Sequence, residues 1–272
     1  MKPLVSICIP TYNSANFIRE TLACVLNQTY TNIEVNISDD ASDDETLNII
    51  ESINDTRIVL KKNASRLGLE GNWNSALSMA KGEYIKMLPA DDIIDKTCID
   101  KQVAIFEDNE KSQDFALVVC NSSIISPIGE QVLKRQSRLK TGENNSEKVM
   151  KKCLLWGTNV IGEPNVGLFR ASLASDLHYD CSNPYMLDLD FWAKLLKKGT
   201  LYVQSEQLAS FRISSKQLTA KIGFSQACLF DEFIKKISQD PYWKIPFLLR
   251  MWSKIASRIM LLVRLLVHKK IT

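Results

Sequence analysis

Paired and single carboxylates stand where apolar runs give way to polar turns. Asp39-Asp40 and Asp91-Asp92 each follow a strand-like run, and Asp188 opens a helix-like one. In open α/β sheets, ligands bind beyond the carboxyl ends of the strands, so both pairs are expected at the same edge. Carboxylates there can accept hydrogen bonds from a base or ribose, or bind Mg²⁺ or Mn²⁺, which prefer oxygen ligands. Helix capping would better explain one pair alone, but two such pairs favour a nucleotide and metal site.

The elements that must position these residues follow an α/β pattern. Residues 1–105 alternate apolar runs with helical periodicity, which predicts a mostly parallel sheet with strands at 4–9, 33–38, 57–61 and 84–88 and helices at 15–26, 43–53, 71–80 and 96–107. The remainder predicts strands at 115–120, 123–125, 165–169 and 201–205, and helices at 146–156 and 188–198. The polar stretch 134–147 is predicted to be a mobile loop.

Five segments, in this order, resemble glycosyltransferase family 2, the inverting enzymes of the GT-A fold. They are V-S-I-C-I-P-T-Y-N (5–13), S-D-D-A-S-D-D (38–44), G-E-Y-I-K-M-L-P-A-D-D (82–92), G-E-P-N-V-G-L-F-R (162–170) and D-L-D-F-W-A-K-L-L-K-K-G (188–199). The resemblance extends over residues 1–215. It implies a Rossmann-like central sheet flanked by helices, in a catalytic domain that we place at 1–222. The remaining residues, 223–272, are expected to form a helical tail. Residues 1–105 would then form the nucleotide-sugar-binding half and 106–222 the acceptor-side half.

The resemblance also implies roles for individual residues. Those expected at the nucleotide sugar are Pro10, Thr11, Tyr12, Asp39, Asp40, Asn72, Asn74 and Asp91. Asp91 and Asp92 would divide ribose contact and metal ligation between them. The diphosphate and water molecules would complete the coordination shell of the Mg²⁺ or Mn²⁺ ion. For Tyr12 core packing is the alternative, and for the two asparagines helix capping is. Arg212 would neutralise the diphosphate or form an ion pair.

Asp188 is the residue that the resemblance implies as general base, because it lies four residues before Trp192. One carboxylate within reach of the acceptor hydroxyl is enough for this role. Asp190 is the competing candidate. Two departures, Leu187 beside the base and Pro89 in place of the first acid of an Asp-x-Asp motif, keep a non-catalytic nucleotide-sugar-binding relative as the alternative. A nicotinamide-dependent oxidoreductase is disfavoured, since no Gly-x-Gly-x-x-Gly follows the first strand.

The charge is unevenly distributed along the chain. Residues 241–272 carry seven basic and no acidic residues, which leaves 27 basic against 31 acidic residues elsewhere, about −4. An acidic body disfavours nucleic-acid binding, whereas the basic tail favours a local anionic partner. Seven scattered cysteines suggest neither a disulfide framework nor a zinc site and fit a reducing compartment. Residues 1–10 do not resemble a secretion signal, so a cytoplasmic location is expected.

The tail at 246–270 combines an apolar face with basic residues that recur every four positions, Arg250, Lys254 and Arg258, with Arg264 nearby on the helical wheel. Its charges interrupt the apolar run too often for a transmembrane span. We therefore expect an amphipathic helix lying on an anionic membrane surface at the inner face of the cell membrane. Packing of the apolar face on the catalytic domain or on a second subunit is the alternative. A lipid-linked or glycan acceptor in surface polysaccharide biosynthesis would fit this location.

Overall fold

The computed structural model describes residues 2–107, 112–213 and 225–271, with the backbone alone at 112 and 265–271. The domain boundary predicted at residue 222 lies outside these ranges, as do the side chains of Lys269 and Lys270. The described strands form one sheet in the order β3 (Ile58–Lys62), β2 (Ile33–Asp39), β1 (Val5–Thr11), β4 (Tyr84–Met87), β9 (Gly167–Arg170), β6 (Phe115–Ile125), β10 (Thr200–Arg212) and β5 (Ile93–Ile94). On this sheet, β7 (Gln131–Arg135) also pairs with β6, and β8 (Gly142–Asn144) pairs with β10.

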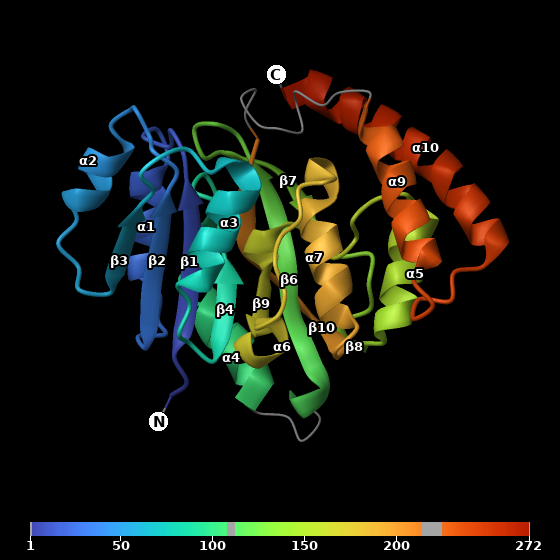
Figure 1. Cartoon of the computed structure of the whole chain (residues 1–272), viewed down its shortest axis with the longest axis horizontal. Helices are drawn as coiled ribbons and strands as arrows, with labels where there is room; N and C mark the ends of the chain where they lie inside the picture. Colours follow the sequence, from blue (N-terminus) through green and yellow to red (C-terminus); the bar gives the residue numbers. More distant parts are fainter. Residues whose placement is uncertain (1, 108–111, 214–224, 272) are drawn as a thin grey trace.

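Strands β3, β2, β1 and β4 run parallel, whereas β9 is antiparallel to both of its neighbours. Strands β1, β2 and β4 are buried along their length, which is why β1 is rich in apolar residues, whereas the edge strand β3 is partly exposed. The chain enters β1 from the bottom of Figure 1, so the carboxyl ends of these strands lie at the top, where α10 also ends. This arrangement brings the ends of β1 and β2 to one edge, as predicted.

Helices pack on the sheet, and several of them lie together at one side of the molecule (Figure 1). Their bounds are α1 (Ile18–Leu26), α2 (Thr46–Glu51), α3 (Gly68–Ser78), α4 (Cys98–Glu107), α5 (Ser146–Trp156), α6 (Ala171–Ala174), α7 (Leu187–Leu196), α9 (Gln226–Gln239) and α10 (Phe247–Ile271). Short 3₁₀ turns occur at η1 (Ser112–Asp114), η2 (Pro164–Val166) and η3 (Pro184–Met186). Trp192 anchors α7 to the sheet: a Cβ on Gly167 of β9 would lie 2.9 Å from its ring, so only glycine allows this approach.

Three sequence-based expectations were wrong. The strands predicted at 115–120 and 123–125 form one strand, β6, since its pairing with β10 continues through the polar residues 121–122. The stretch 134–147 is not simply a loop: it contains the end of β7 and all of β8, and Asn145 caps α5 by accepting from the Lys148 amide. Strand β10 is longer than predicted, and its register against β6 shifts twice between Val203 and Ala209.

Helix α9 belongs to the same core as the sheet. Four of its apolar side chains, Phe230, Phe233, Ile234 and Ile237, are buried in the hydrophobic cluster that contains the strands. Helix α10 packs on α5 and α9, and Gly157 at the end of α5 touches its backbone at Ala256 and Ser257. The first part of the predicted tail therefore packs as part of the domain that contains the sheet.

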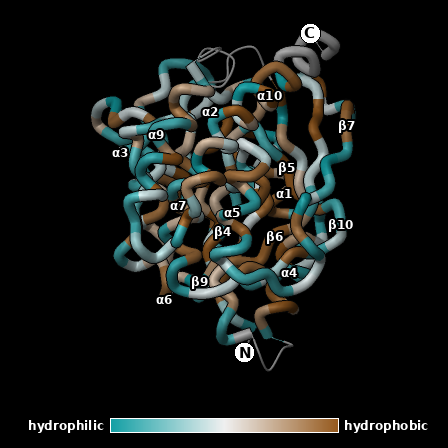
Figure 2. The backbone as a smooth tube through the Cα atoms, turned by 90° about the vertical axis from the view of Figure 1, so that its right-hand side faces the viewer, coloured by the Kyte–Doolittle hydropathy of each residue, from teal (hydrophilic) through white to brown (hydrophobic). Residues whose placement is uncertain are grey.

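The basic stripe predicted on the tail is not a single surface facing solvent. Arg258 forms an ion pair with Asp231 of α9 at 2.6 Å, and Arg264 donates to Thr158 Oγ1 at 2.5 Å and to Gln226 Oε1 at 3.1 Å. The outer surface of α10 carries the exposed apolar residues Leu248, Met251, Ile255, Ile259 and Leu262, together with the exposed basic residues Lys254 and Arg258. Figure 2 looks onto the side of the molecule that carries this helix. No helix in the described ranges has the length and apolar content to span a bilayer.

Candidate active site

The end of β1 and the end of β2 are joined by buried hydrogen bonds. Thr11 Oγ1 donates to Asp39 Oδ2 at 2.9 Å, and the same carboxylate accepts from the Ser42 amide and hydroxyl at 2.9 and 2.7 Å. Asp39 is fully buried, as is Pro10, and both oxygens of Asp39 hold the turn after β2. The structure thus gives Asp39 a structural contact, and its role toward a nucleotide stays a prediction.

Asp40 caps α3 from another element. Its Oδ1 accepts from the Leu67 amide at 2.6 Å and its Oδ2 from the Gly68 amide at 3.0 Å, which satisfies N–H groups that the helix leaves open. This contact explains why α3 begins at Gly68, three residues before the predicted start. Each carboxylate oxygen can accept a second bond, so the geometry is compatible with the predicted contact to a base without testing it.

Tyr12 is the exposed residue of this edge. The residue is 37% exposed, and the guanidinium carbon of Arg66 lies over its ring at 4.0 Å from the centroid. Arg66 Nε also lies 4.0 Å from Asp40 Oδ2. A solvent-facing aromatic ring and cation beside a carboxylate offer stacking and phosphate contacts to a nucleotide. Sequence reasoning had not singled out Arg66.

Asn72 and Asn74 do not cap α3, because both lie inside the helix. Asn72 Nδ2 donates to the Thr11 carbonyl at 3.0 Å and so ties α3 to the end of β1. Asn74 forms a two-way pair with the backbone of Tyr179, donating at 2.9 Å and accepting at 2.8 Å. The capping alternative was therefore wrong for both residues, and their predicted contact with the donor remains untested.

Asp91 and Asp92 lie in the turn after β4, and Arg212 at the end of β10 holds that turn. The Arg212 amide donates to Asp92 Oδ1 at 2.9 Å and its Nε donates to the Asp91 carbonyl at 2.8 Å. The Arg212 side chain is buried and ion-paired with Glu20 at 2.5 Å. The ion-pair alternative for Arg212 is thus observed.

Burial separates the two carboxylates of this turn. Asp92 is fully buried, while Asp91 is only partly so. Burial and the neighbouring Asp91 raise the pKa of Asp92 well above its ordinary value, and its Oδ2 is buried without a hydrogen-bond partner. Such a pair fits a hard divalent cation, which binds through one or two carboxylates and takes its other ligands from phosphate and water. No cluster of three or more metal-ligating side chains occurs within residues 2–107, 112–213 and 225–271.

Asp188 lies at the start of α7 and remains partly accessible. Asn159 Nδ2 donates to its Oδ2 at 3.0 Å, and the Leu189 amide donates to its Oδ1 at 2.7 Å. Burial, followed by the negative charge of Glu163, raises the pKa of Asp188 to about 7. A carboxylate with a pKa near neutrality is well matched to accept a proton from a hydroxyl at physiological pH.

Arg135 and Glu163 form an ion pair, and Arg135 interacts electrostatically with both Asp92 and Asp188. Arg135 at the end of β7 pairs with Glu163, and its Nη2 also donates to Ser122 Oγ at 2.9 Å. Burial lowers the pKa of Arg135, but the carboxylates of Glu163, Asp92 and Asp188 more than offset this, so its pKa is raised. Sequence reasoning missed this pair: Arg135 lay in the predicted loop, and Glu163 was part of a matched segment but had no assigned role.

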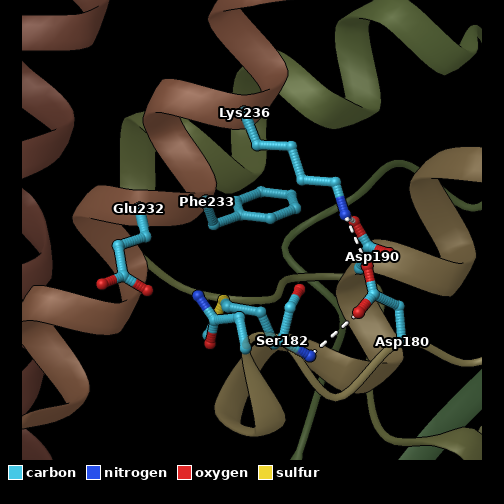
Figure 3. Close-up of a pocket in the computed structure, with 8 residues that line it drawn as sticks. Asp180, Ser182, Asp190, Glu232, Phe233 and Lys236 are labelled. Carbon is cyan, nitrogen blue, oxygen red and sulfur yellow. Dashed lines mark hydrogen bonds and ion pairs between the residues drawn. The ribbon is translucent and has the colours of Figure 1, made fainter.

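Asp190, the competing base, faces α9. It is ion-paired with Lys194 at 2.8 Å and with Lys236 at 2.6 Å. Lys236 also pairs with Asp180, and these groups line a cavity of about 210 Å³ between α9 and the segment before α7 (Figure 3). Its two ammonium partners hold the Asp190 carboxylate on the α9 side of α7.

A family model for glycosyl transferase family 2 matches residues 6–174, which include most of β1, both carboxylate pairs and Glu163. The chain belongs to glycosyltransferase family 2. A relative described as an uncharacterised glycosyltransferase of Haemophilus influenzae is 27% identical over 246 residues, covering 88% of this chain and 73% of its own length. The chain is thus a glycosyltransferase, and the sequence-based family assignment is confirmed.

Three further similarities are to one named enzyme and to two solved structures. WfaP of Escherichia coli, named a UDP-Glc:alpha-D-GlcNAc-diphosphoundecaprenol beta-1,3-glucosyltransferase, is 45% identical over 104 residues, 38% of this chain and 41% of WfaP. Residues 1–349 of S. aureus TarS, solved with UDP-GlcNAc, superpose with a TM-score of 0.68 at 19% identity over 89% of this chain and 68% of TarS. The mannosyltransferase PcManGT of Pyrobaculum calidifontis, solved with GDP-Man and Mn²⁺, superposes with a TM-score of 0.64 at 18% identity. The match covers 94% of this chain and 70% of PcManGT. These structures confirm the GT-A fold.

Proposed function

We propose that this glycosyltransferase moves a sugar from a nucleoside diphosphate, most simply a UDP-sugar, to a hydroxyl of a glycan or lipid-linked acceptor, with inversion at the anomeric carbon. The observation that carries the proposal is Asp188, a partly accessible carboxylate with a pKa of about 7 at the head of α7. The names of WfaP and TarS support a UDP-sugar donor, and that of WfaP supports a lipid-linked acceptor in surface polysaccharide synthesis.

The reaction we propose is a single displacement. Asp188 takes the proton of the acceptor hydroxyl, and the oxygen forms a bond to the anomeric carbon. The bond from that carbon to the diphosphate oxygen breaks on the opposite face, and its electron pair leaves with the nucleoside diphosphate. Asn159 holds Asp188 in place through its 3.0 Å bond, and Arg212 holds the Asp91-Asp92 turn.

Mg²⁺ or Mn²⁺ is the cofactor that we propose for Asp91 and Asp92. A divalent cation bound there would supply positive charge to the departing diphosphate. Asp91, the more accessible residue, is the better candidate for direct ligation, whereas the Asp92 carboxylate is buried against the Arg212 amide. The presence of Mn²⁺ in the PcManGT structure agrees with this choice.

Nucleotide release from a panel of UDP- and GDP-sugars, with a diphosphate-lipid acceptor and with or without Mn²⁺, tests the proposal. Asp188→Asn should lower kcat by roughly a hundredfold or more, because the amide cannot accept the proton. Asp190→Asn should retain most of the rate, since Asp190 is held by two lysines. A rate above about a tenth of wild type for Asp188→Asn would exclude it as the base. Binding of a donor without any release would instead favour a non-catalytic binding protein.

We also propose that the enzyme is cytoplasmic and associates peripherally with the inner face of the membrane through α10. The exposed apolar residues Leu248, Met251, Ile255, Ile259 and Leu262 recur every three or four positions and so share one face. Two exposed basic residues are close by in the chain: Lys244 precedes α10, and Lys254 lies on it. A helix of this kind suits the plane of an anionic bilayer surface and would bring the site to a lipid-linked acceptor.

A further inference from the structure

Glu163 and Asn159 lie on one short segment that faces Asp188. The Gly162 carbonyl accepts from Asn159 Nδ2 at 2.9 Å, and the same nitrogen donates to Asp188 Oδ2 at 3.0 Å. Trp192 of α7 also donates to the Gly162 carbonyl, at 3.2 Å. One amide nitrogen thus links the base to the residue directly before Glu163, so the position of Glu163 relative to Asp188 is fixed by the fold.

Arg135 keeps Glu163 ionised. Burial alone would raise the pKa of Glu163, but the Arg135 guanidinium more than offsets this, and the pKa lies below its ordinary value. Arg135 is itself fixed by Ser122 Oγ, which accepts from Nη2 at 2.9 Å, and its guanidinium carbon lies 5.8 Å from the Phe211 ring centroid. Glu163 is therefore a stationary negative charge rather than a group that titrates near neutral pH.

Two other titratable groups that interact with Asp188, Cys153 and Tyr179, do not add a negative charge beside it. Burial raises the pKa of the Cys153 thiol on α5 to about 12 and that of Tyr179 well above its ordinary value, so both stay neutral. Arg264 of α10 interacts electrostatically with Glu163 and Arg135. Among the described residues, Glu163 is the anion that raises the pKa of Asp188 most.

We propose that Glu163, fixed by Arg135, is a positioning residue for the transfer reaction, and that its permanent negative charge makes Asp188 a stronger acceptor of the hydroxyl proton. Before proton transfer the two carboxylates repel each other. When the acceptor O–H bond breaks and the proton moves to Asp188, Asp188 becomes neutral and the repulsion is relieved. The negative charge of Glu163 therefore favours the state in which Asp188 is protonated and the acceptor oxygen has lost its proton. This inference rests on the proposed role of Asp188 as base.

Glu163→Gln tests the inference, because it removes the charge and keeps the shape. The titration of Asp188 would be followed by carbon-detected NMR of the labelled aspartate carboxyl groups, with its signal assigned by its absence in Asp188→Asn. We expect the Asp188 midpoint to fall by about one pH unit in Glu163→Gln. Glu143→Gln, the same change at an exposed residue of β8, is the control and should leave the midpoint in place.

The pH dependence of kcat/KM provides the second measurement. Its acid limb should move down with the NMR midpoint, while the rate on the plateau falls roughly threefold to tenfold because the base is weaker. Glu163→Asp, which keeps the charge, should restore part of the plateau rate. If Glu163→Gln leaves Arg135 unpaired and the protein does not fold, the double variant Glu163→Gln/Arg135→Gln removes both charges. The midpoint should then fall by a smaller amount, because the attraction between Arg135 and the Asp188 carboxylate is lost as well.

Two outcomes would contradict the inference in different ways. An Asp188 midpoint that stays in place in Glu163→Gln, or in the double variant, would overturn the role of Glu163 whether or not transfer is detected. A midpoint that falls while the acid limb of kcat/KM does not move would show that Asp188 is not the base. The assignment of Asp188 as base, and the role of Glu163 that rests on it, would then both fail, although transfer itself is observed.

Discussion

At the scale of single residues, the raised pKa of Asp188 lowers the free energy of unfolding at neutral pH. Its pKa is raised from an ordinary value of 3.8 to about 7, so the folded state disfavours the charged form. Below about pH 4 the group is protonated in folded and unfolded chains and contributes nothing. Between about pH 4 and 7 the unfolded chain loses this proton first, so stability falls as the pH rises, and above about pH 7 the loss is complete.

Asp188→Asn should therefore stabilise the folded protein while it lowers the rate of transfer. Urea unfolding is expected to show a gain of roughly 1–2 kcal/mol at pH 8, after allowance for solvent screening of a partly accessible group. The gain should shrink toward zero near pH 4 because both forms are then neutral. A stability difference that did not change between pH 4 and pH 8 would contradict the raised pKa.

Asp91→Asn should weaken the response to metal more than it weakens the fold. Asp91 is the partly accessible carboxylate of the pair, so its loss removes a cation ligand without exposing the core. We expect the Mn²⁺ concentration for half-maximal rate to rise about tenfold or more. Asp100→Asn on α4, an exposed aspartate, is the control. Unchanged Mn²⁺ dependence in Asp91→Asn would assign the metal elsewhere.

The residues of the site were only partly predictable from the sequence. Asp40, Asp91 and Asp188 were visible because each stands at the end or start of a regular element. Arg135 and Glu163 were not, since their pairing depends on β7 lying against the segment before η2, contacts between positions far apart in the chain. Nor could the sequence show that Asp39 and Asp40 already hold their own turn and helix.

At the scale of elements, the junction of α5 and α10 makes a strong prediction. Gly157 ends α5 with φ of 61°, and a Cβ there would lie 2.7 Å from Ser257 Cα and overlap the adjoining backbone of α10. Gly157→Ala should lower the free energy of unfolding by roughly 2–4 kcal/mol, from backbone strain plus overpacking.

Gly142→Ala is the matched control for this junction. Gly142 also has a positive φ, 92°, but nothing lies within 4 Å of the added Cβ. Its loss should be limited to about 1–2 kcal/mol of backbone strain. Equal losses in the two variants, measured by urea unfolding, would mean that α10 can shift away from α5 at little cost.

The elements of the first half were predictable because strands buried on both faces and amphipathic helices leave clear periodic patterns. The second half was harder. In β6 and β10, polar residues such as Asn121 and Gln207 sit within strands because they hydrogen-bond to neighbouring backbone, so the pattern suggested breaks where the sheet continues. Strand β5 has only two residues, too few to leave any periodicity.

At the scale of the whole molecule, the apolar face of α10 predicts binding to anionic vesicles. The wild type should co-sediment with vesicles that contain phosphatidylglycerol, and Ile255→Glu should weaken this by roughly tenfold, since it replaces buried apolar area with charge. Val59→Glu, at an exposed apolar residue on edge strand β3, is the control. Failure of the wild type to co-sediment, or dimers by analytical ultracentrifugation that Ile255→Glu dissociates, would assign this face to a second copy instead.

The uneven register of β10 sets where the chain can change length. Arg212, at its carboxyl end, holds the Asp91-Asp92 turn, while the register against β6 already shifts between Val203 and Ala209. One inserted residue near Gln204 would enlarge an existing bulge and leave Arg212 where it is. The same insertion after Ala209 would carry Arg212 about 3.3 Å along the strand and turn its side chain to the other face. Insertions and deletions during evolution would therefore be tolerated near Gln204, whereas those after Ala209 would displace Arg212 from the Asp91-Asp92 turn.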